Sequence, residues 1–232
     1  MKPMHSLSVI CPIFNGEKFI QEAILSIIHQ SWKPENLEIV LVNDNSTDHT
    51  ELKCLALAQK YPNIKYISSK KNYGVAHSRN VGIKSSKHQY LSFIDQDDVW
   101  PIDKLYLQSQ YIDDEFDYLI GLQCFELYEI KTFPIWFKEK WAKQPQNAHV
   151  FGTLLIEKTK FLEVGLLNES LRLTDDLDWF MRAKIKNKKE FTVPHVLLKR
   201  KIHANNHSAD IKNSRKEIIG ILKNKIHFER VQ

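Results

Sequence analysis

Short apolar runs alternate with amphipathic segments through the first half of the chain. Four of these runs are expected to form strands: residues 7–11, 37–42, 64–67 and 90–94. The near-continuous apolar run at residues 37–42 is typical of a strand buried on both faces. Three intervening segments place apolar residues at helical spacing: residues 17–29, 46–60 and 76–84. Ser46 or Thr47 is the expected cap of the second helix, and Pro12 is the expected end of the first strand. This alternation predicts an α/β fold with a mostly parallel sheet and helices on both faces.

The second half of the chain is less regular. Three runs are expected to form strands: residues 117–130, 151–156 and 191–198. Two segments are expected to be helical, the second of them closing the fold: residues 174–186 and 211–228. Pro101 suits the first turn of a further helix. Residues 131–146 contain Trp136, Trp141 and several lysines with weak periodicity, so we interpret them as a mobile or acceptor-facing loop.

Length and composition are those of one ordinary soluble domain, because 232 residues can bury a sizeable core. Cys11, Cys54 and Cys124 are odd in number and far apart, which favours buried thiols over a disulfide framework or a zinc site. Residues 1–6 do not resemble a signal peptide, and no apolar stretch reaches the ~18 residues that a membrane span needs. We therefore expect a cytoplasmic protein.

The net charge of +5 is unevenly distributed along the chain. Basic residues crowd the C-terminal third: Lys184, Lys186, Lys188, Lys189, Lys199, Arg200 and Lys201. The simplest interpretation is a solvated surface. The alternative is attraction to an anionic substrate, or peripheral contact with the inner face of a membrane. A nucleic-acid partner is not expected, because no recognisable binding motif accompanies the charge.

Polar residues follow several of the predicted strands. In parallel sheets, ligands bind beyond the carboxyl ends of the strands. Asn15, Asp44, the segment after Ile67 and Asp95 are therefore expected to meet in one crevice. Two roles stay open for Asp44: part of a turn before a helix, or a carboxylate that accepts a hydrogen bond from a nucleobase or a ribose.

Asp95 and Asp97 directly follow an apolar strand. In an extended chain their side chains project to the same side. Two carboxylates at this spacing suit Mn²⁺ or Mg²⁺, which would take its remaining ligands from water and phosphate. The alternative is a turn and helix cap ahead of Pro101, a role that we assign first to Asp98.

Two later segments also contain residues that can carry chemistry. Thr174 is followed by three aspartates in residues 175–178, which suits a helix N-terminus but exceeds what a cap requires. Asp176 is therefore a candidate general base that would deprotonate an acceptor hydroxyl. His203 and His207 are separated by two asparagines that predict a loop, which disfavours a helical metal pair. One histidine reaching the cation, or two surface histidines, are the remaining interpretations.

The order of these motifs resembles that of the family 2 glycosyltransferases of the GT-A fold, across nearly the whole chain. Seven segments carry the resemblance: residues 8–17, 26–32, 43–48, 72–83, 93–98, 165–182 and 200–208. The first of them, SVICPIFNGE, looks like the family's opening strand and nucleotide loop. The expected fold is therefore of GT-A type, with a single mostly parallel, twisted sheet flanked by helices.

The resemblance implies a role for each candidate site residue. The nucleotide-sugar pocket would be lined by Pro12, Phe14, Asn15, Glu17, Asp44, Gly74, Arg79, Asp95 and Gln96. Asp97 would ligate Mn²⁺ or Mg²⁺, while Asp95 would face the cation or the ribose. His203 would complete the metal shell or touch a phosphate, and Asp176 would be the catalytic base.

The implied reaction is inverting transfer from a nucleoside diphosphate sugar, expected to be a UDP-sugar, to a hydroxyl group. The metal would stabilise the departing diphosphate. The acceptor would be a saccharide, a lipid-linked saccharide or a peptide, in the synthesis of a glycan, a cell-surface polysaccharide or a glycoconjugate. Acceptor choice is assigned to residues 131–146 and the C-terminal tail.

The resemblance also implies one domain with three parts: a nucleotide-binding half at residues 1–100, an acceptor and catalytic half at 101–210, and a C-terminal helix at 211–232. Two departures from the family pattern matter. Asn45 replaces a glycine that tolerates positive φ, which asparagine tolerates next best. Asp175 stands where glutamate is common, which leaves open whether Asp175 or Asp176 is the base.

Three other classes of protein fit less well. A catalytically silent scaffold that binds nucleotide or a partner is disfavoured by the intact Asp97 and Asp176. A nucleotidyltransferase would carry a glycine-rich phosphate loop with a basic residue, which residues 12–18 do not resemble. A dinucleotide oxidoreductase would carry G-x-G-x-x-G, which is absent from a chain with only seven glycines.

Overall fold

The computed structural model describes residues 6–112, 115–204, 206 and 210–231. Four parallel strands make up the first half of the sheet: β1 (Ser6–Ile13), β2 (Asn36–Asn43), β3 (Ile64–Ser68) and β4 (Tyr90–Phe93). Three helices connect them: α1 (Ile20–Ile28), α2 (Thr50–Lys60) and α3 (Val75–Ser85). The predicted alternation of strands and helices is confirmed.

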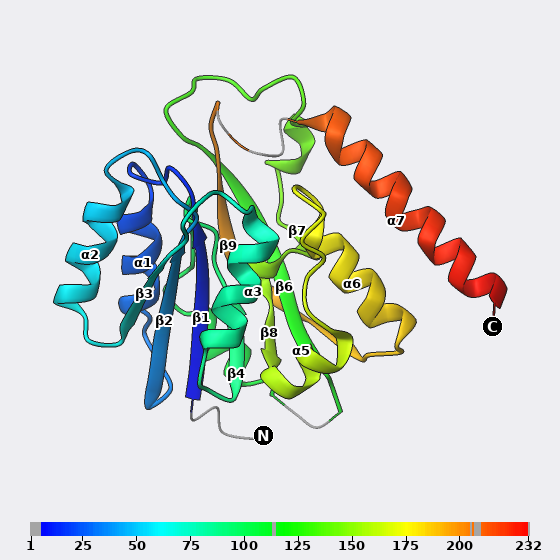
Figure 1. Cartoon of the computed structure of the whole chain (residues 1–232), viewed down its shortest axis with the longest axis horizontal. Coiled ribbons are helices and arrows are strands. Elements are labelled where there is room, and N and C mark those ends of the chain that lie inside the picture. The colour runs from blue at the N-terminus through cyan, green and yellow to red at the C-terminus, as the bar shows by residue number, and fades with distance from the viewer. Residues whose placement is uncertain (1–5, 113–114, 205, 207–209, 232) are drawn as a thin grey trace.

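The second half of the chain extends the same sheet. Its strands are β5 (Asp98–Val99), β6 (Tyr118–Leu127), β7 (Gln146–Ala148), β8 (Leu155–Glu157) and β9 (Glu190–Ile202). Its helices are α4 (Lys104–Ser109), α5 (Lys158–Val164), α6 (Asp175–Ile185) and α7 (Ile211–Val231), with 3-10 turns η1 (Glu139–Trp141) and η2 (Phe151–Thr153). The strand order is β3-β2-β1-β4-β8-β6-β9-β5, with β7 paired to β6 (Figure 1). Four of the eight strand pairs are parallel, and these are the longer ones. β8 runs antiparallel between β4 and β6, and β5 and β7 pair antiparallel with β9 and β6.

β1 is buried on both faces because helices cover the sheet on both sides. Val9 packs into one core cluster together with Ile24 of α1. The next residue, Ile10, packs into a second cluster with Ile83 of α3 and Trp179 of α6. Successive side chains of a strand point to opposite faces, so a strand between two helix layers needs a continuous apolar run. Each buried aliphatic side chain contributes roughly 1.5–3 kcal/mol.

Pro12 lies inside β1 rather than ending it, because the strand continues to Ile13. The carbonyl of Ile13 accepts from the N–H of Asp44 beyond β2, whereas the carbonyl of Ile10 accepts from Ile94 beyond β4. By this alternation Pro12 faces the β4 side, where the pairing stops at Ile10. Its missing N–H therefore leaves no sheet hydrogen bond unmade.

Ser46 and Thr47 do not cap α2, contrary to expectation. The helix begins at Thr50, whose N–H donates to Asp48 Oδ1 at 3.0 Å. Ser46 instead donates from its hydroxyl to Asn43 Oδ1 at 2.6 Å, which closes the loop after β2. The side chains of this loop are therefore used to shape the edge of the sheet.

Other differences lie in the second half of the chain. α4 begins beyond Pro101, not around it. The strand predicted over residues 151–156 divides into η2 and β8, because the Thr153 hydroxyl donates to Ala148 O at 2.9 Å and turns the chain. α5 was not predicted at all. Residues 131–146, predicted to lack regular structure, contain η1 and the first residue of β7.

Asn45 has a φ of 61°, which confirms the conformation expected where the family pattern has glycine. Cys11 and Cys54 are buried free thiols. No helix in the described part of the chain is both long enough and apolar enough to cross a membrane.

Candidate active site

A cavity of about 480 Å³ lies at the carboxyl ends of β1, β2 and β4, where the parallel sheet predicts a ligand site. Nine of the residues predicted for the site are among its walls: Pro12, Phe14, Asp44, Gly74, Arg79, Asp95, Gln96, Asp97 and Asp176. Asn15, Glu17 and His203 are not wall residues of this cavity. The volume suits a small organic ligand.

Asp44 holds the loop that precedes α3. Its Oδ1 accepts a hydrogen bond from the N–H of Tyr73 at 2.9 Å, and its Oδ2 accepts from the N–H of Gly74 at 2.7 Å. Gly74 has a φ of 101°, and a Cβ there would lie 2.3 Å from Nη1 of Arg172. Asp44 is buried and also lines the cavity, so its two proposed roles, in a loop and at a ligand, are compatible.

Asn15 and Glu17 connect the loop after β1 to the start of α2. Asn15 has a φ of 50°, and its Oδ1 accepts from the N–H of Thr47 at 2.8 Å. Glu17 Oε2 accepts from the N–H of His49 at 3.2 Å. Their side chains are thus engaged with neighbouring loops beside the cavity.

Gln96 uses its side chain to hold the backbone of Phe14. Its Oε1 accepts from the Phe14 N–H and its Nε2 donates to the Phe14 carbonyl, each at 2.9 Å. Gly16 makes this possible, because a Cβ there would lie 2.4 Å from Gln96 Oε1. The structure therefore gives Gln96 a positioning role at the wall of the cavity.

Arg79 joins two acidic segments that are far apart in the sequence. Its Nη2 donates to Asp95 Oδ1 at 2.5 Å and its Nη1 donates to Asp175 Oδ2 at 2.7 Å. Its guanidinium carbon lies 5.2 Å from the centroid of the Phe151 ring. Burial lowers the pKa of Arg79, but the charges of Asp175 and Asp95 outweigh burial and raise it. Arg79 therefore stays cationic and holds both carboxylates.

Asp97 and His203 are brought together, as predicted for the two motifs. His203 Nε2 lies 3.0 Å from Asp97 Oδ2, and the His203 ring stacks on Phe19 at 4.7 Å between centroids. Asn206 Oδ1 accepts from the His203 N–H at 2.6 Å. Burial raises the pKa of Asp97, but the hydrogen bond with His203 and the charge of Arg200 lower it below its ordinary value. His207 lies outside the described residues.

Asp98 belongs to β5 and is not the helix cap that we expected. It pairs with Arg200 of β9 in the sheet register, and the Arg200 Nε lies 3.9 Å from its Oδ2. Burial raises the pKa of the Asp98 carboxyl well above its ordinary value. Asp98 is 4% exposed and absent from the cavity walls, which assigns it to the sheet.

Asp175 and Asp176 begin α6 and have different surroundings. Asp175 is buried against Arg79. Asp176 is partly exposed at the cavity, and its only described hydrogen bond is from the N–H of Leu177 at 2.7 Å. Burial and the neighbouring Asp175 raise the pKa of Asp176 to about 6. A carboxylate with this pKa can accept a proton near neutral pH.

Two functional candidates were missed in the sequence. Arg172 lines the cavity, and its guanidinium has no hydrogen bond or ion pair among the described residues. Glu217 of α7 accepts from the N–H groups of Arg172 and Leu173 at 2.9 and 3.1 Å and from the Thr174 hydroxyl at 2.8 Å. Glu217 lies more than 40 residues from these partners, so no local capping pattern signals its role.

The chain matches the model of the glycosyl transferase family 2 over residues 8–163. An uncharacterized glycosyltransferase of Rickettsia typhi is 31% identical over 211 residues, which cover 85% of this chain and 64% of the relative. The minor teichoic acid biosynthesis protein GgaB of Bacillus subtilis is 45% identical over 95 residues, which cover 41% of this chain and 11% of the relative. This chain thus spans less than two thirds of these relatives.

Two solved structures share the fold. S. aureus TarS 1-349 in complex with UDP-GlcNAc superposes with a TM-score of 0.68 at 21% identity, over 88% of this chain and 61% of that one. The mannosyltransferase PcManGT from Pyrobaculum calidifontis, in complex with GDP-Man and Mn²⁺, gives a TM-score of 0.73 at 18% identity, over 95% of this chain and 64% of that one. Both have the GT-A fold, which confirms the predicted fold class.

Proposed function

Because the chain belongs to glycosyl transferase family 2, we propose that it transfers a sugar from a nucleoside diphosphate sugar to an acceptor hydroxyl, with inversion at the anomeric carbon. One observation carries the proposal. Arg79 binds Asp175 and Asp95, which leaves Asp176 at the cavity with a pKa of about 6 and no cationic partner of its own among the described residues. This is the state required of a general base.

The donor would lie along the carboxyl ends of β1, β2 and β4. Phe14 offers a half-exposed ring at the cavity, and Asp44 offers a carboxylate edge to a ribose or a base. Arg172 contributes a guanidinium with no partner in the described structure, which suits a diphosphate. Two structural neighbours bind UDP-GlcNAc and GDP-Man, and we propose a UDP-sugar as the first donor to test.

A divalent cation fits the pair of Asp97 and His203. A carboxylate and an imidazole already lie 3.0 Å apart, and they offer O and N ligands of the kind that Mn²⁺ accepts. Asp95 forms an ion pair with Arg79, so it could ligate the cation only if its carboxylate contacted the cation and Arg79 at the same time. No group of three ligating side chains occurs among the described residues, so diphosphate and water would complete the shell. When bound, the cation would neutralise charge on the departing diphosphate.

In the proposed transfer one bond forms at the anomeric carbon, one breaks, and one proton moves to Asp176. Asp176 takes the proton of the acceptor hydroxyl, and the hydroxyl oxygen forms a bond to the anomeric carbon. The bond from that carbon to the diphosphate breaks on the opposite side, and the diphosphate leaves with the electron pair. Arg79 forms an ion pair with Asp175, which holds the first turn of α6 and with it Asp176.

We propose glycan assembly as the setting, with a saccharide, a lipid-linked saccharide or a peptide as acceptor. The likeness to the GgaB protein supports a cell-surface polymer. We place the reaction in the cytoplasm or at the inner face of its membrane, which suits three free cysteines.

A thermal-shift screen of nucleoside diphosphate sugars with Mn²⁺, followed by an assay for released nucleoside diphosphate, tests the proposal. A ligand at about 100 times its dissociation constant should stabilise the protein by roughly 2.7 kcal/mol. We expect at least one such sugar to raise the melting temperature and to be turned over. If none of them binds, the proposed function is wrong.

A further inference from the structure

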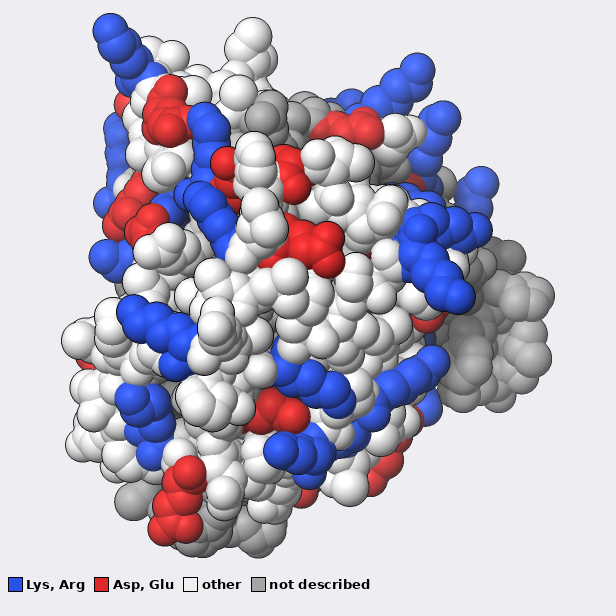
Figure 2. All heavy atoms as spheres, turned by 60° about the vertical axis from the view of Figure 1, so that its left-hand side comes forward, with Lys and Arg blue, Asp and Glu red and all other residues white. Residues whose placement is uncertain are grey.

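The basic residues of the C-terminal third, which the sequence offers as an anionic-surface site, are largely engaged within the protein. Lys188 forms ion pairs with Glu163 and with Asp117. Two others also face carboxylates: Lys199 pairs with Glu126 and Lys201 pairs with Glu22. On the face that Figure 2 displays, which is the side of α1 and α2, Asp and Glu side chains also lie between the basic ones. These residues do not form a free cationic surface.

A different segment, residues 131–143, is here called the tip loop. Its lysines are Lys131, Lys138, Lys140 and Lys143, and all four are exposed. The described residues include no ion-pair partner for any of them, and Glu139 is the only acidic residue of the loop. The tip loop therefore has an uncompensated positive charge.

The tip loop is built around a buried ring, which gives it a defined shape. Phe137 is 6% exposed and stacks on Phe133 at 4.6 Å between centroids. The rings of Phe125, Trp136 and Trp141 meet Phe137 edge-on, at 5.0, 6.0 and 5.5 Å. This aromatic cluster explains why the segment lacks helical periodicity but is still ordered around one centre.

Ile135 lies at the outside of this cluster with its side chain fully exposed. Leu52 and Ile102, the next most exposed of the large apolar side chains described, are each 64% exposed. An aliphatic side chain held out by an ordered aromatic base, beside Trp136 and four lysines, has the pattern of an interfacial anchor. A soluble polyanion would satisfy the lysines but would leave Ile135 in water.

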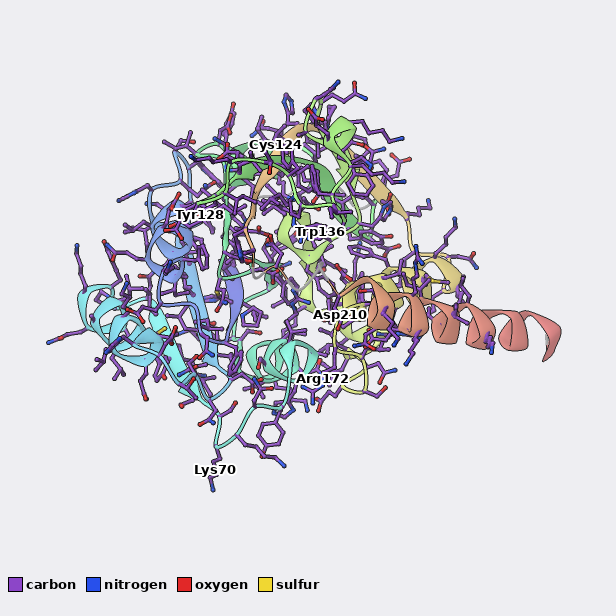
Figure 3. All side chains as sticks on the ribbon, turned by 90° about the horizontal axis from the view of Figure 1, so that it is seen from above. Lys70, Cys124, Tyr128, Trp136, Arg172 and Asp210 are labelled. Carbon is purple, nitrogen blue, oxygen red and sulfur yellow. The ribbon has the colours of Figure 1, made fainter. Side chains whose placement is uncertain are left out.

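The tip loop lies at the same edge of the sheet as the cavity. It follows β6 and sits at the end of the molecule where β1 and β2 finish (Figure 1). Figure 3 looks onto this edge, with Trp136 and the cavity residue Arg172 both labelled. A surface bound by the tip loop would thus be near the opening through which an acceptor must reach Asp176.

We propose that the tip loop docks on an anionic lipid bilayer, with Ile135 and Trp136 entering the interface and the four lysines contacting the headgroups. Lysines near an anionic leaflet and an inserted apolar side chain act together, because each alone gives weak binding. That this docking serves a membrane-borne acceptor rests on the proposed function. The docking itself does not.

Vesicle co-sedimentation of the full chain tests the proposal without any nucleotide sugar. We expect binding to vesicles of phosphatidylcholine mixed with phosphatidylglycerol to exceed binding to phosphatidylcholine alone by about tenfold or more. Ile135→Glu should lower that binding by about tenfold, whereas the matched variant Leu52→Glu on α2 should leave it unchanged. Equal binding of the wild type and Ile135→Glu would overturn the proposal.

The charge contribution is tested by exchanging the four lysines of the tip loop for glutamine. The control exchanges four other exposed lysines: Lys60, Lys65, Lys84 and Lys87. We expect only the tip-loop variant to lose vesicle binding and its dependence on salt. Soluble polyphosphate is the competing ligand. If it binds the wild type and Ile135→Glu equally and displaces vesicles completely, the surface is a polyanion site and not a bilayer anchor.

The two proposals fail separately. Vesicle binding without sugar transfer would contradict only the proposed function. Sugar transfer without vesicle binding would contradict only the docking of the tip loop.

Discussion

Two acidic segments meet at the cavity, one after β4 and one at the start of α6. In each of them Arg79 forms an ion pair with one aspartate and not with another. After β4 it binds Asp95 and leaves Asp97; in α6 it binds Asp175 and leaves Asp176. In each segment one carboxylate is used to hold the two halves of the molecule together. The other is left for chemistry.

The two remaining carboxylates differ in their partners. Asp97 has His203 at 3.0 Å and Arg200 nearby, and its pKa is lowered despite burial. Asp176 has no such partner, and burial with the adjacent Asp175 raises its pKa to about 6. An ionised carboxylate suits a cation, and one that titrates near neutral pH suits a proton. The comparison teaches that surroundings, and not residue type, assign the two roles.

Removing Arg79 should abolish the difference between the paired and the remaining carboxylates, because Asp95 and Asp175 both lose their ion-pair partner. Arg79→Met leaves Asp175 buried without its cation, which is expected to cost about 3–5 kcal/mol of unfolding free energy and to abolish transfer. Urea denaturation measures the cost. Arg215→Met, at an exposed position of α7, is the control and should change little. A loss below about 1 kcal/mol for Arg79→Met would contradict the bridging role.

Exchanging the two aspartates of α6 separates their roles. Asp176→Asn should lower the transfer rate by about 10²–10⁴-fold while nucleotide binding and folding persist. Asp175→Asn should instead lower stability, because Arg79 loses a buried partner. Steady-state kinetics and denaturation of both variants give the answer. Near-normal transfer by Asp176→Asn with inactive but stable Asp175→Asn would make Asp175 the base.

The raised pKa of Asp176 predicts two opposite pH effects. Transfer should fall about tenfold per pH unit below about 6, because only the ionised carboxylate accepts a proton. The free energy of unfolding should change in the opposite direction. The folded state binds the proton of Asp176 more tightly than the unfolded state does. The stabilisation from this proton is therefore present at low pH and is lost as the pH rises through about 6. In Asp176→Asn that part of the pH dependence of unfolding should disappear. A rate that stays flat through this range would exclude Asp176 as the base.

A smaller effect is expected at the loop that presents Asp175 and Asp176. Glu217→Ala removes the acceptor for two backbone N–H groups and the Thr174 hydroxyl, so we expect a loss of about 1–2 kcal/mol and faster hydrogen exchange at Arg172 and Leu173. Glu35→Ala, an exposed glutamate, is the control. Unchanged exchange at both amides would show that α7 does not hold this loop.

Much of the fold was predictable because its signals are local. A strand buried on both faces requires a continuous apolar run, as around Val9 and Ile10, and the parallel sheet then brings Asp44 and Asp95 to one edge. β8 was only partly predicted. A strand of three residues is too short for its sequence to indicate that it lies antiparallel between β4 and β6.

The division of roles within the site was not predictable from spacing. The contact of Arg79 with Asp175 spans 96 residues, and that of Gln96 with Phe14 spans 82. Such contacts depend on packing between elements that no local pattern encodes. Asp98 shows the same limit: it looks like a helix cap in sequence but pairs with Arg200 in the sheet.

Calorimetric titration of a nucleoside diphosphate with Mn²⁺ into Asp97→Asn and Asp176→Asn tests the central claim most directly. UDP and GDP are the probes, since the structural neighbours bind UDP-GlcNAc and GDP-Man. We predict that Asp97→Asn loses the part of the affinity that depends on Mn²⁺, and that Asp176→Asn binds as the wild type does. Retained Mn²⁺-dependent binding in Asp97→Asn, with binding lost in Asp176→Asn, would contradict the assignment of the two carboxylates.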